Sequence, residues 1–247
     1  GNGDGTLKWL STLTTAGVPG VPVVGQWDGD GLPDLAVPVY LPGKLELFAH
    51  AKDAKTANFT ATSGISLPCA DNAKSVLVGS LDGTPGDDFF VFGSNSKWCV
   101  IPNAGGLTGT PALAPWGGSK LGLGRFDAGP TLDAWSGGSV WPGNGKGAFA
   151  KGPATTMSGV AGVFDFDNDG DSDLLVAGST LVVHDNDGTG QFTPRQTGIQ
   201  VPVGFGVWAI RVGDVDGDGL DDAALTQDSP GGAKDLVVLR NKGYGGM

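Results

Sequence analysis

Short apolar runs separated by loops rich in aspartate and glycine dominate the chain. Runs such as 21–25, 34–37, 173–176 and 208–212 are rich in valine, leucine, isoleucine and alanine. Runs of this length, bounded by glycine, proline and aspartate, indicate β-strands rather than helices. Only the stretch 49–58 has a helix-forming composition, and we expect it to be a long turn. The pattern therefore predicts an all-β protein.

Five similar loops recur along the chain. They occupy residues 26–34, 80–88, 125–133, 165–173 and 214–222. Every copy has an aspartate at its third position, and successive copies lie 40 to 54 residues apart. One apolar run precedes each loop, a second follows it at once, and a third comes after a short turn; a fourth opens at turns such as 145–149 and 188–192. Strand-rich repeats of about 40–50 residues are typical of propeller blades.

The fourth loop, 165–173, indicates a calcium site. Its five aspartates alternate along nine residues, and like charges this close repel one another unless a cation compensates them. Calcium is a hard cation that accepts about six to eight oxygen ligands, and Gly170 allows the sharp turn that such a loop needs. An EF-hand would need a glutamate at position 12 and flanking helices, whereas position 12 is Val176 in an apolar run. We therefore expect the loop to join two strands.

Three of the five loops keep a full set of candidate ligands. The side chains expected to bind calcium are Gln26, Asp28, Asp30 and Asp34; Asp165, Asp167, Asp169 and Asp173; and Asp214, Asp216, Asp218 and Asp222. Position 7, which is Leu32, Asp171 or Leu220, is expected to bind through its backbone carbonyl oxygen. One such loop alone is more often a solvated turn, but three copies in register favour the metal. The first loop has one carboxylate fewer and should bind most weakly.

These loops resemble the FG-GAP/VCBS repeat, whose units follow a pattern close to GDxDGDGxxDL, and the resemblance covers the whole chain. It implies an integrin-α-like β-propeller with calcium in its loops. We therefore expect one domain, 1–247, of five four-stranded blades. Residues 1–7 match a turn into a fourth strand and residues 237–241 match a third strand, so the N-terminal strand is expected to complete the last blade and remove its open edge. A fragment of a longer array is the alternative.

Composition narrows the classes of partner. The net charge is −11, from 26 acidic and 15 basic residues, and Glu46 is the only glutamate. The three full loops hold 13 of the other 25 acidic residues, so the acidity belongs mostly to the metal loops. An acidic chain without a Lys/Arg cluster disfavours nucleic acid. No run of 18 apolar residues predicts membrane insertion, and the absence of a leader pattern is expected for a mature or trimmed chain.

The two cysteines, Cys69 and Cys99, lie in one repeat unit. We expect a disulfide formed in an oxidising compartment, and a pair of buried thiols is the alternative. Calcium loops of this type also suit extracellular fluid. Together these features predict a secreted or cell-surface protein.

Aromatic residues fall into two groups. Position 2 of the loops is Trp27, Leu81, Phe126, Phe166 or Val215, and it alternates with the ligands, so we expect it to pack between blades. Among the other tryptophans, Trp9, Trp135 and Trp208 lie in strand patterns and should be core residues, and Trp98 and Trp141 lie in third strands. Trp116 stands among proline and glycine at 114–118, which predicts an exposed ring that could stack on a sugar. Lys120 could add a donor and Trp141 a second ring; ordinary packing is the alternative.

Catalytic patterns are sparse. His50 and His184 belong to no metal-binding or hydrolytic motif, no GxSxG elbow is present, and Tyr40 and Tyr244 are the only tyrosines. We therefore expect a non-catalytic binding or adhesion module outside the cell, with a glycan or a protein as its ligand and calcium as its cofactor. A secreted polysaccharide lyase is the alternative, because some such enzymes also resemble propellers.

Overall fold

The structure is a computed structural model. It describes residues 11–51, 59–62, 64–69, 71–103, 109–117, 120–152, 154–155, 157, 159–178, 180–195, 206–228 and 234–243. The chain divides into two compact units, Gly1–Ala114 and Pro115–Met247, and each is described by itself. A single domain spanning 1–247 stays a prediction.

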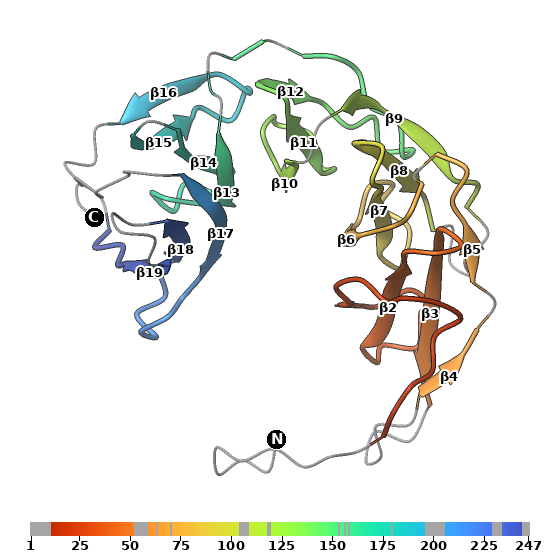
Figure 1. The fold of residues 1–247 in the computed structure, drawn as a ribbon. Helices are drawn as coiled ribbons and strands as arrows, with labels where there is room; N and C mark the ends of the chain where they lie inside the picture. Colours follow the sequence, from red (N-terminus) through yellow and green to blue (C-terminus); the bar gives the residue numbers. More distant parts are fainter. Residues whose placement is uncertain are drawn as a thin grey trace. The chain divides into compact units, whose positions relative to one another are not determined.

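The first unit contains two sheets. One follows the order β1 (Val23–Gly25), β2 (Asp34–Val39), β3 (Lys44–His50) and β4 (Phe59–Ala61), and β5 (Ile65–Ser66) also pairs with β3. The other follows β6 (Ser75–Gly79), β7 (Asp88–Phe92), β8 (Lys97–Ile101) and β9 (Ala112–Gly117), and the last residues of β9 belong to the second unit. Apart from β5, successive strands of the chain are neighbours in these sheets (Figure 1).

The second unit contains three further sheets with the same consecutive order. They are β10 (Gly122–Gly124), β11 (Asp133–Ser136) and β12 (Ser139–Trp141); β13 (Val160–Phe164), β14 (Asp173–Ala177), β15 (Leu181–Asn186) and β16 (Phe192–Arg195); and β17 (Val207–Gly213), β18 (Asp222–Asp228) and β19 (Lys234–Leu239). Each of the five sheets that the described residues form therefore contains one copy of the loop.

Every loop joins the first strand of its sheet to the second, as the sequence predicts. In all five antiparallel pairs the position 9 aspartate is opposite the residue that precedes the loop: Gly25 with Asp34, Gly79 with Asp88, Gly124 with Asp133, Phe164 with Asp173 and Gly213 with Asp222. Because the connections have one length and one register, the position 9 aspartate takes an equivalent place in every copy.

The all-β prediction is confirmed, but the expected four strands per sheet are found in only part of the chain. The sheets β6–β9 and β13–β16 have four strands, the first sheet has five, and β10–β12 and β17–β19 have three among the described residues. After β12, the predicted fourth strand forms only isolated bridges, such as that of Gly143 with Phe149. Most of the expected N-terminal strand (1–10) and of the turn at 49–58 (52–58) lies outside the described residues. No described helix is long and apolar enough to cross a bilayer.

Position 2 side chains enter the core in four of the five loops. Trp27, Leu81, Phe126 and Phe166 are each at most 2% exposed. Trp27 belongs to the core of the first unit, and Phe126 and Phe166 belong to two clusters in the second. Val215 is 63% exposed, so the packing role expected for position 2 is not seen in the last loop.

One predicted core tryptophan is exposed. Trp135 is buried as expected, but Trp208 is 68% exposed. The pairing of β17 with β18 shifts register between Val207 and Ala209, so Trp208 lies at an irregularity of the strand. Such a bulge breaks the alternation of side chains that the sequence pattern assumes. Trp9 lies outside the described residues.

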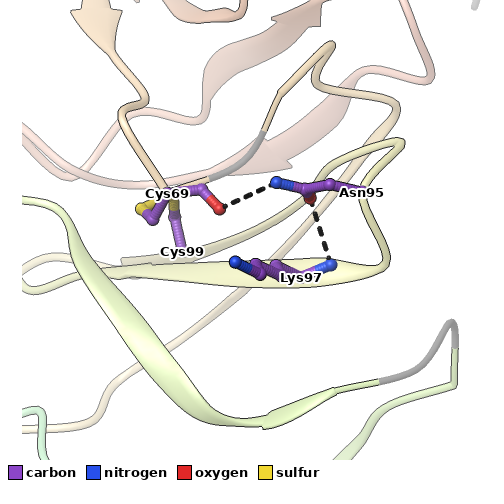
Figure 2. Close-up of a disulfide and its surroundings, with 4 residues drawn as sticks. All are labelled: Cys69, Asn95, Lys97 and Cys99. Atoms are coloured by element: carbon purple, nitrogen blue, oxygen red, sulfur yellow. Dashed lines mark hydrogen bonds between the residues drawn. A yellow bond between two sulfur atoms is a disulfide. The ribbon is translucent and has the colours of Figure 1, made fainter.

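The predicted disulfide between Cys69 and Cys99 is present, with Cα atoms 5.5 Å apart. Figure 2 shows how the neighbouring turn supports it: the side-chain amide of Asn95 donates to the carbonyl oxygen of Cys69 (3.5 Å), and the backbone amide of Lys97 donates to Asn95 Oδ1 (3.2 Å). Cys99 belongs to the buried core of the first unit. The bridge therefore fastens the segment before β6 to the third strand of the same repeat.

Candidate metal centres

The first residue of each full loop holds the loop in a tight curl. In the fourth loop, Asp165 Oδ1 accepts a hydrogen bond from the backbone amide of Asp169 (3.1 Å), and its Oδ2 accepts one from Gly170 (3.0 Å). In the fifth loop Asp214 accepts such bonds from Gly217, Asp218 and Gly219, and in the first loop the correctly oriented Gln26 amide oxygen accepts them from Gly29, Asp30 and Gly31. The curl depends on backbone with positive φ, as at Gly170 (99°).

This curl brings carboxylates together in the fourth and fifth loops. Among the described residues, oxygens of Asp165, Asp167 and Asp173 all lie within 4.8 Å of one another. The same holds for Asp214, Asp216 and Asp218. In the fourth loop these candidate ligands come from both the loop and the start of the second strand, at Asp173, so a shared cation would fasten the two together. In the fifth loop all three come from the loop itself.

Several carboxylate oxygens are buried without a hydrogen-bond partner. They are Asp30 Oδ2, Asp167 Oδ1 and Asp171 Oδ1. A buried acceptor without a donor is costly, and a cation removes that cost. Asp171 was expected to contribute only its backbone carbonyl, but this orphaned oxygen makes its side chain a further candidate ligand.

Electrostatics in the fourth loop point the same way. Burial, followed by the charges of Asp169 and Asp165, raises the pKa of Asp171 to about 6. Burial is also the largest cause that raises the pKa of Asp173 to about 7, against the opposing effect of backbone hydrogen bonds. The ionised carboxylates thus destabilise one another in the metal-free loop. An all-oxygen donor set with orphaned buried acceptors fits a calcium ion.

Two arginines reach these loops, and no local sequence pattern predicts their contacts. Arg240, which follows β19, forms ion pairs with Asp216 and with Asp218 (3.1 Å to the latter). Arg195, at the end of β16, lies 3.5 Å from Asp167 and also pairs with Asp185. Each guanidinium neutralises part of the negative charge that calcium would neutralise.

Position 9 has a second role, which explains why all five loops keep its aspartate. One oxygen of each accepts the backbone amide of position 2, and the other accepts an amide that follows the third strand. The partners are Trp27 and His50 for Asp34, Leu81 and Asn103 for Asp88, Phe126 and Gly143 for Asp133, Phe166 and Asn186 for Asp173, and Val215 and Asn241 for Asp222. All five carboxylates are at most 1% exposed. Asp88 and Asp133 keep these bonds in loops that lack the full ligand set.

An asparagine after the third strand links neighbouring repeats within each unit. The side-chain amide of Asn103 donates to the carbonyl oxygen of Trp27 (2.7 Å), and those of Asn186 and Asn241 donate to Phe126 and Phe166 (3.2 Å each). The acceptor is always position 2 of the preceding loop. The recurring asparagine after an apolar run is a sequence signal that could have revealed this link; the equivalent residues in the first and third repeats are His50 and Gly143.

The predicted ligand-binding aromatics are partly wrong. Trp116 is 5% exposed in β9, and its ring contacts those of Trp141 (5.7 Å between centroids) and Phe149 (4.8 Å, edge-on). The expectation of an exposed loop residue therefore fails, because the surrounding prolines and glycines do not prevent strand formation. Trp141 is partly exposed and donates to the carbonyl oxygen of Ser136 (3.2 Å), and Lys120 is exposed.

Neither histidine side chain belongs to a carboxylate cluster found among the described residues, although the backbone amide of His50 donates to Asp34 (2.8 Å). His50 ends β3, and both of its ring nitrogens are buried without a hydrogen-bond partner while the ring stacks on Phe59. His184 lies in β15, and burial lowers its pKa. His50 is thus a strand-end residue, whereas His184 lies within its strand.

Comparison with known proteins supports the repeat family. Residues 165–225 match the family model of the FG-GAP-like repeat, and no curated protein matches the chain. The chain is similar to the crystal structure of the V. cholerae biofilm matrix protein Bap1, with 14% identity and a TM-score of 0.55 over 95% of this chain and 40% of that one. A structure of BBS1N in complex with ARL6DN, soaked with lead, matches at 10% identity over 92% and 79% of the chains, but its TM-score of 0.43 carries no argument.

The likeness to Bap1 supports the all-β fold alone, and this chain spans only 40% of the length of that protein. The family match covers the fourth and fifth loops, which are the two that gather three carboxylates each. The resemblance predicted from the loop motifs is thus confirmed there, because residues 165–225 match the model of the FG-GAP-like repeat.

Proposed function

We propose that this chain is an extracellular, calcium-stabilised binding module without catalytic activity. The observation that carries the proposal is the fourth loop, where clustered carboxylates and two orphaned buried oxygens lie within an FG-GAP-like repeat. The disulfide of Cys69 with Cys99 supports an oxidising compartment, and calcium loops suit extracellular fluid. The ligand would be a glycan or a protein surface.

Calcium would be structural in this module. Asp165, Asp167, Asp169, Asp171 and Asp173 would hold it in the fourth loop, and the equivalent residues would hold it in the fifth and, more weakly, in the first. The ion would cancel the repulsion among these carboxylates and fasten the first strand to the second. Residues elsewhere on this rigid frame would bind the glycan or protein ligand.

The proposed architecture is a closed five-bladed propeller. Among the strands that the structure describes, β19 pairs with β18 alone in the last sheet, so its other edge is the place where a fourth strand would add. The N-terminal strand would fill that edge, since the start of the chain matches a fourth strand and the end matches a third. Closure would leave no strand edge available for aggregation.

Thermal unfolding with calcium and with a chelator tests the proposal. Calcium that binds only the folded state should raise the melting temperature, with about 2.7 kcal/mol of stabilisation at 100 times Kd. Asp167→Asn should reduce the calcium-induced shift. Asp82→Asn is the matched control, because Asp82 has the same loop position in a loop without the full ligand set. A melting temperature indifferent to both calcium and chelator would contradict the proposal.

Two further measurements distinguish a binding module from an enzyme. Immobilised glycans and extracellular-matrix proteins should retain the wild-type chain. Incubation with uronate-containing polysaccharides should release no unsaturated product, as followed by ultraviolet absorbance. Release of such a product would show a lyase and would replace the non-catalytic proposal.

A further inference from the structure

The third loop forms one side of a cleft within the second unit. The cleft has a volume of about 510 Å³ and is lined by Asp127–Thr131, by Gly143–Gly145 after β12, and by the Gly188–Thr189 turn of the next sheet. This volume lies within the ~300–1,000 Å³ typical of small-molecule sites. The loop has Arg125 at position 1 and Gly129 at position 5, so it lacks two of the side-chain ligands expected in the metal loops and keeps the aspartates at positions 3 and 9.

Buried hydrogen bonds fix all three walls of this cleft. Asp133 accepts the backbone amides of Asp127 (3.0 Å) and Gly143 (2.8 Å), so one carboxylate ties two walls together. Asn186 donates to the carbonyl oxygen of Phe126 (3.2 Å) and accepts the amide of Gly190 (3.2 Å), which holds the third wall against the loop. A site whose walls are already ordered loses less entropy on binding.

Two side chains in the walls of the cleft, Asp127 and Asn144, can form hydrogen bonds with a sugar. Asp127 Oδ1 accepts the amide of Gly129 (2.7 Å), whereas no hydrogen bond of Oδ2 is found among the described residues. Asn144 Oδ1 accepts the amides of Lys146 and Ala148, which leaves its side-chain N–H groups for a ligand. A carboxylate acceptor beside an amide donor matches neighbouring sugar hydroxyls, which both donate and accept.

Apolar and open surface completes the cleft. Ala128 and Pro130 are exposed in the lining and offer apolar contact to the C–H groups of a sugar ring. Gly145 has a φ of 69°, and a Cβ there would lie 3.1 Å from Thr131 Cγ2, so glycine keeps this side open. The charge of Asp127 disfavours a uronate or a sulfated sugar at the same place.

We propose that this cleft binds a neutral saccharide unit of an extracellular polysaccharide. The inference rests on the proposed function and names the ligand class and the place. The third loop, which has no carboxylate at positions 1 and 5, supplies polar groups for the ligand, and the surrounding repeats supply a rigid frame. This assignment replaces Trp116, which is buried, as the leading saccharide contact.

An array of neutral hexose, N-acetylhexosamine and uronate oligosaccharides tests the proposal, with calcium present throughout. Wild-type chain should bind neutral members, and Asp127→Ala should weaken that binding at least tenfold. Asp82→Ala is the matched control, because Asp82 Oδ1 makes the same bond to the amide of Thr84 (2.9 Å) in the second loop. It should bind like the wild type. Ala128→Arg, which fills the cleft without removing a hydrogen bond, should also abolish binding.

The contrary outcomes distinguish failure of the proposed saccharide site from failure of the proposed function. Equal binding by Asp127→Ala, Ala128→Arg and the wild type would overturn the site and leave a glycan-binding module intact. Preference for uronate members would overturn the neutral assignment. Failure to bind any glycan, in a chain that calcium still stabilises and that retains a protein ligand, would overturn the inference and leave the proposed function standing.

Discussion

Asp133 should stabilise the third sheet independently of calcium. Its carboxylate is 0% exposed and accepts three backbone amides, from Phe126 (2.9 Å), Asp127 (3.0 Å) and Gly143 (2.8 Å). Asp133→Ala would leave these donors without their acceptor, and each unsatisfied buried donor costs about 1–3 kcal/mol. Burial also raises the pKa of Asp133, so part of the gain is offset by desolvation of the charge.

We expect Asp133→Ala to lower the free energy of unfolding by about 3–5 kcal/mol, because partial relaxation and access of water to the half-buried donors reduce the full cost. In a chain of this size each kcal/mol shifts the melting temperature by about 2–4 °C, so we expect a decrease of about 6–20 °C. The loss should be the same in calcium and in chelator. Asp133→Asn keeps the volume and one acceptor oxygen and should lose less.

Circular dichroism melts of both variants, with and without calcium, check this reasoning. Asp167→Asn is the counterpart, because Asp167 belongs to the clustered metal ligands of the fourth loop. It should reduce the calcium response and change the chelator-treated melt little. A loss below about 1 kcal/mol for Asp133→Ala, or a loss seen only with calcium, would refute a metal-independent role.

Three further predictions concern charge and closure. In the metal-free protein the folded-state pKa values of Asp171 (about 6) and Asp173 (about 7) lie above the ordinary aspartate pKa of 3.8, so the folded chain holds these protons more tightly than the unfolded chain does. The stability of the metal-free protein should therefore fall as the pH rises from about 4 to 7, and calcium should remove this fall. A melting temperature in chelator that rises over this range would contradict the prediction. Arg240→Gln should lower the metal-free melting temperature slightly and should tighten calcium binding at the fifth loop by about two- to fivefold. Calorimetric titration measures this affinity, and Arg211→Gln is the control. An unchanged affinity would show that the ion pairs of Arg240 do not compete with calcium. Deleting residues 1–14 should expose a strand edge and cause aggregation in light scattering, and a monomer with the parental melting temperature would argue against the closed propeller.

Local spacing was sufficient to predict the strand–loop–strand units and the disulfide. A run of alternating aspartates with a glycine encodes its own curl, because the hydrogen bonds that form it join residues two to five positions apart, as between Asp165 and Gly170. The strands on either side follow from the same short range. For that reason the sequence also predicted which oxygens of Asp165, Asp167 and Asp173 could gather around a cation.

The tertiary structure decided everything that depends on partners distant in sequence. Asn103 meets the carbonyl oxygen of Trp27 across 76 positions, and the arginine that reaches the fifth loop's carboxylates follows a strand on the far side of the sheet. Burial behaves in the same way: Trp116 is covered by rings from the next repeat, whereas a shift of register leaves Trp208 outside. The local pattern determines the position of a side chain along its strand. The free energy of burying that side chain depends on the surface that it contacts, and only the packing of whole sheets determines which surface this is.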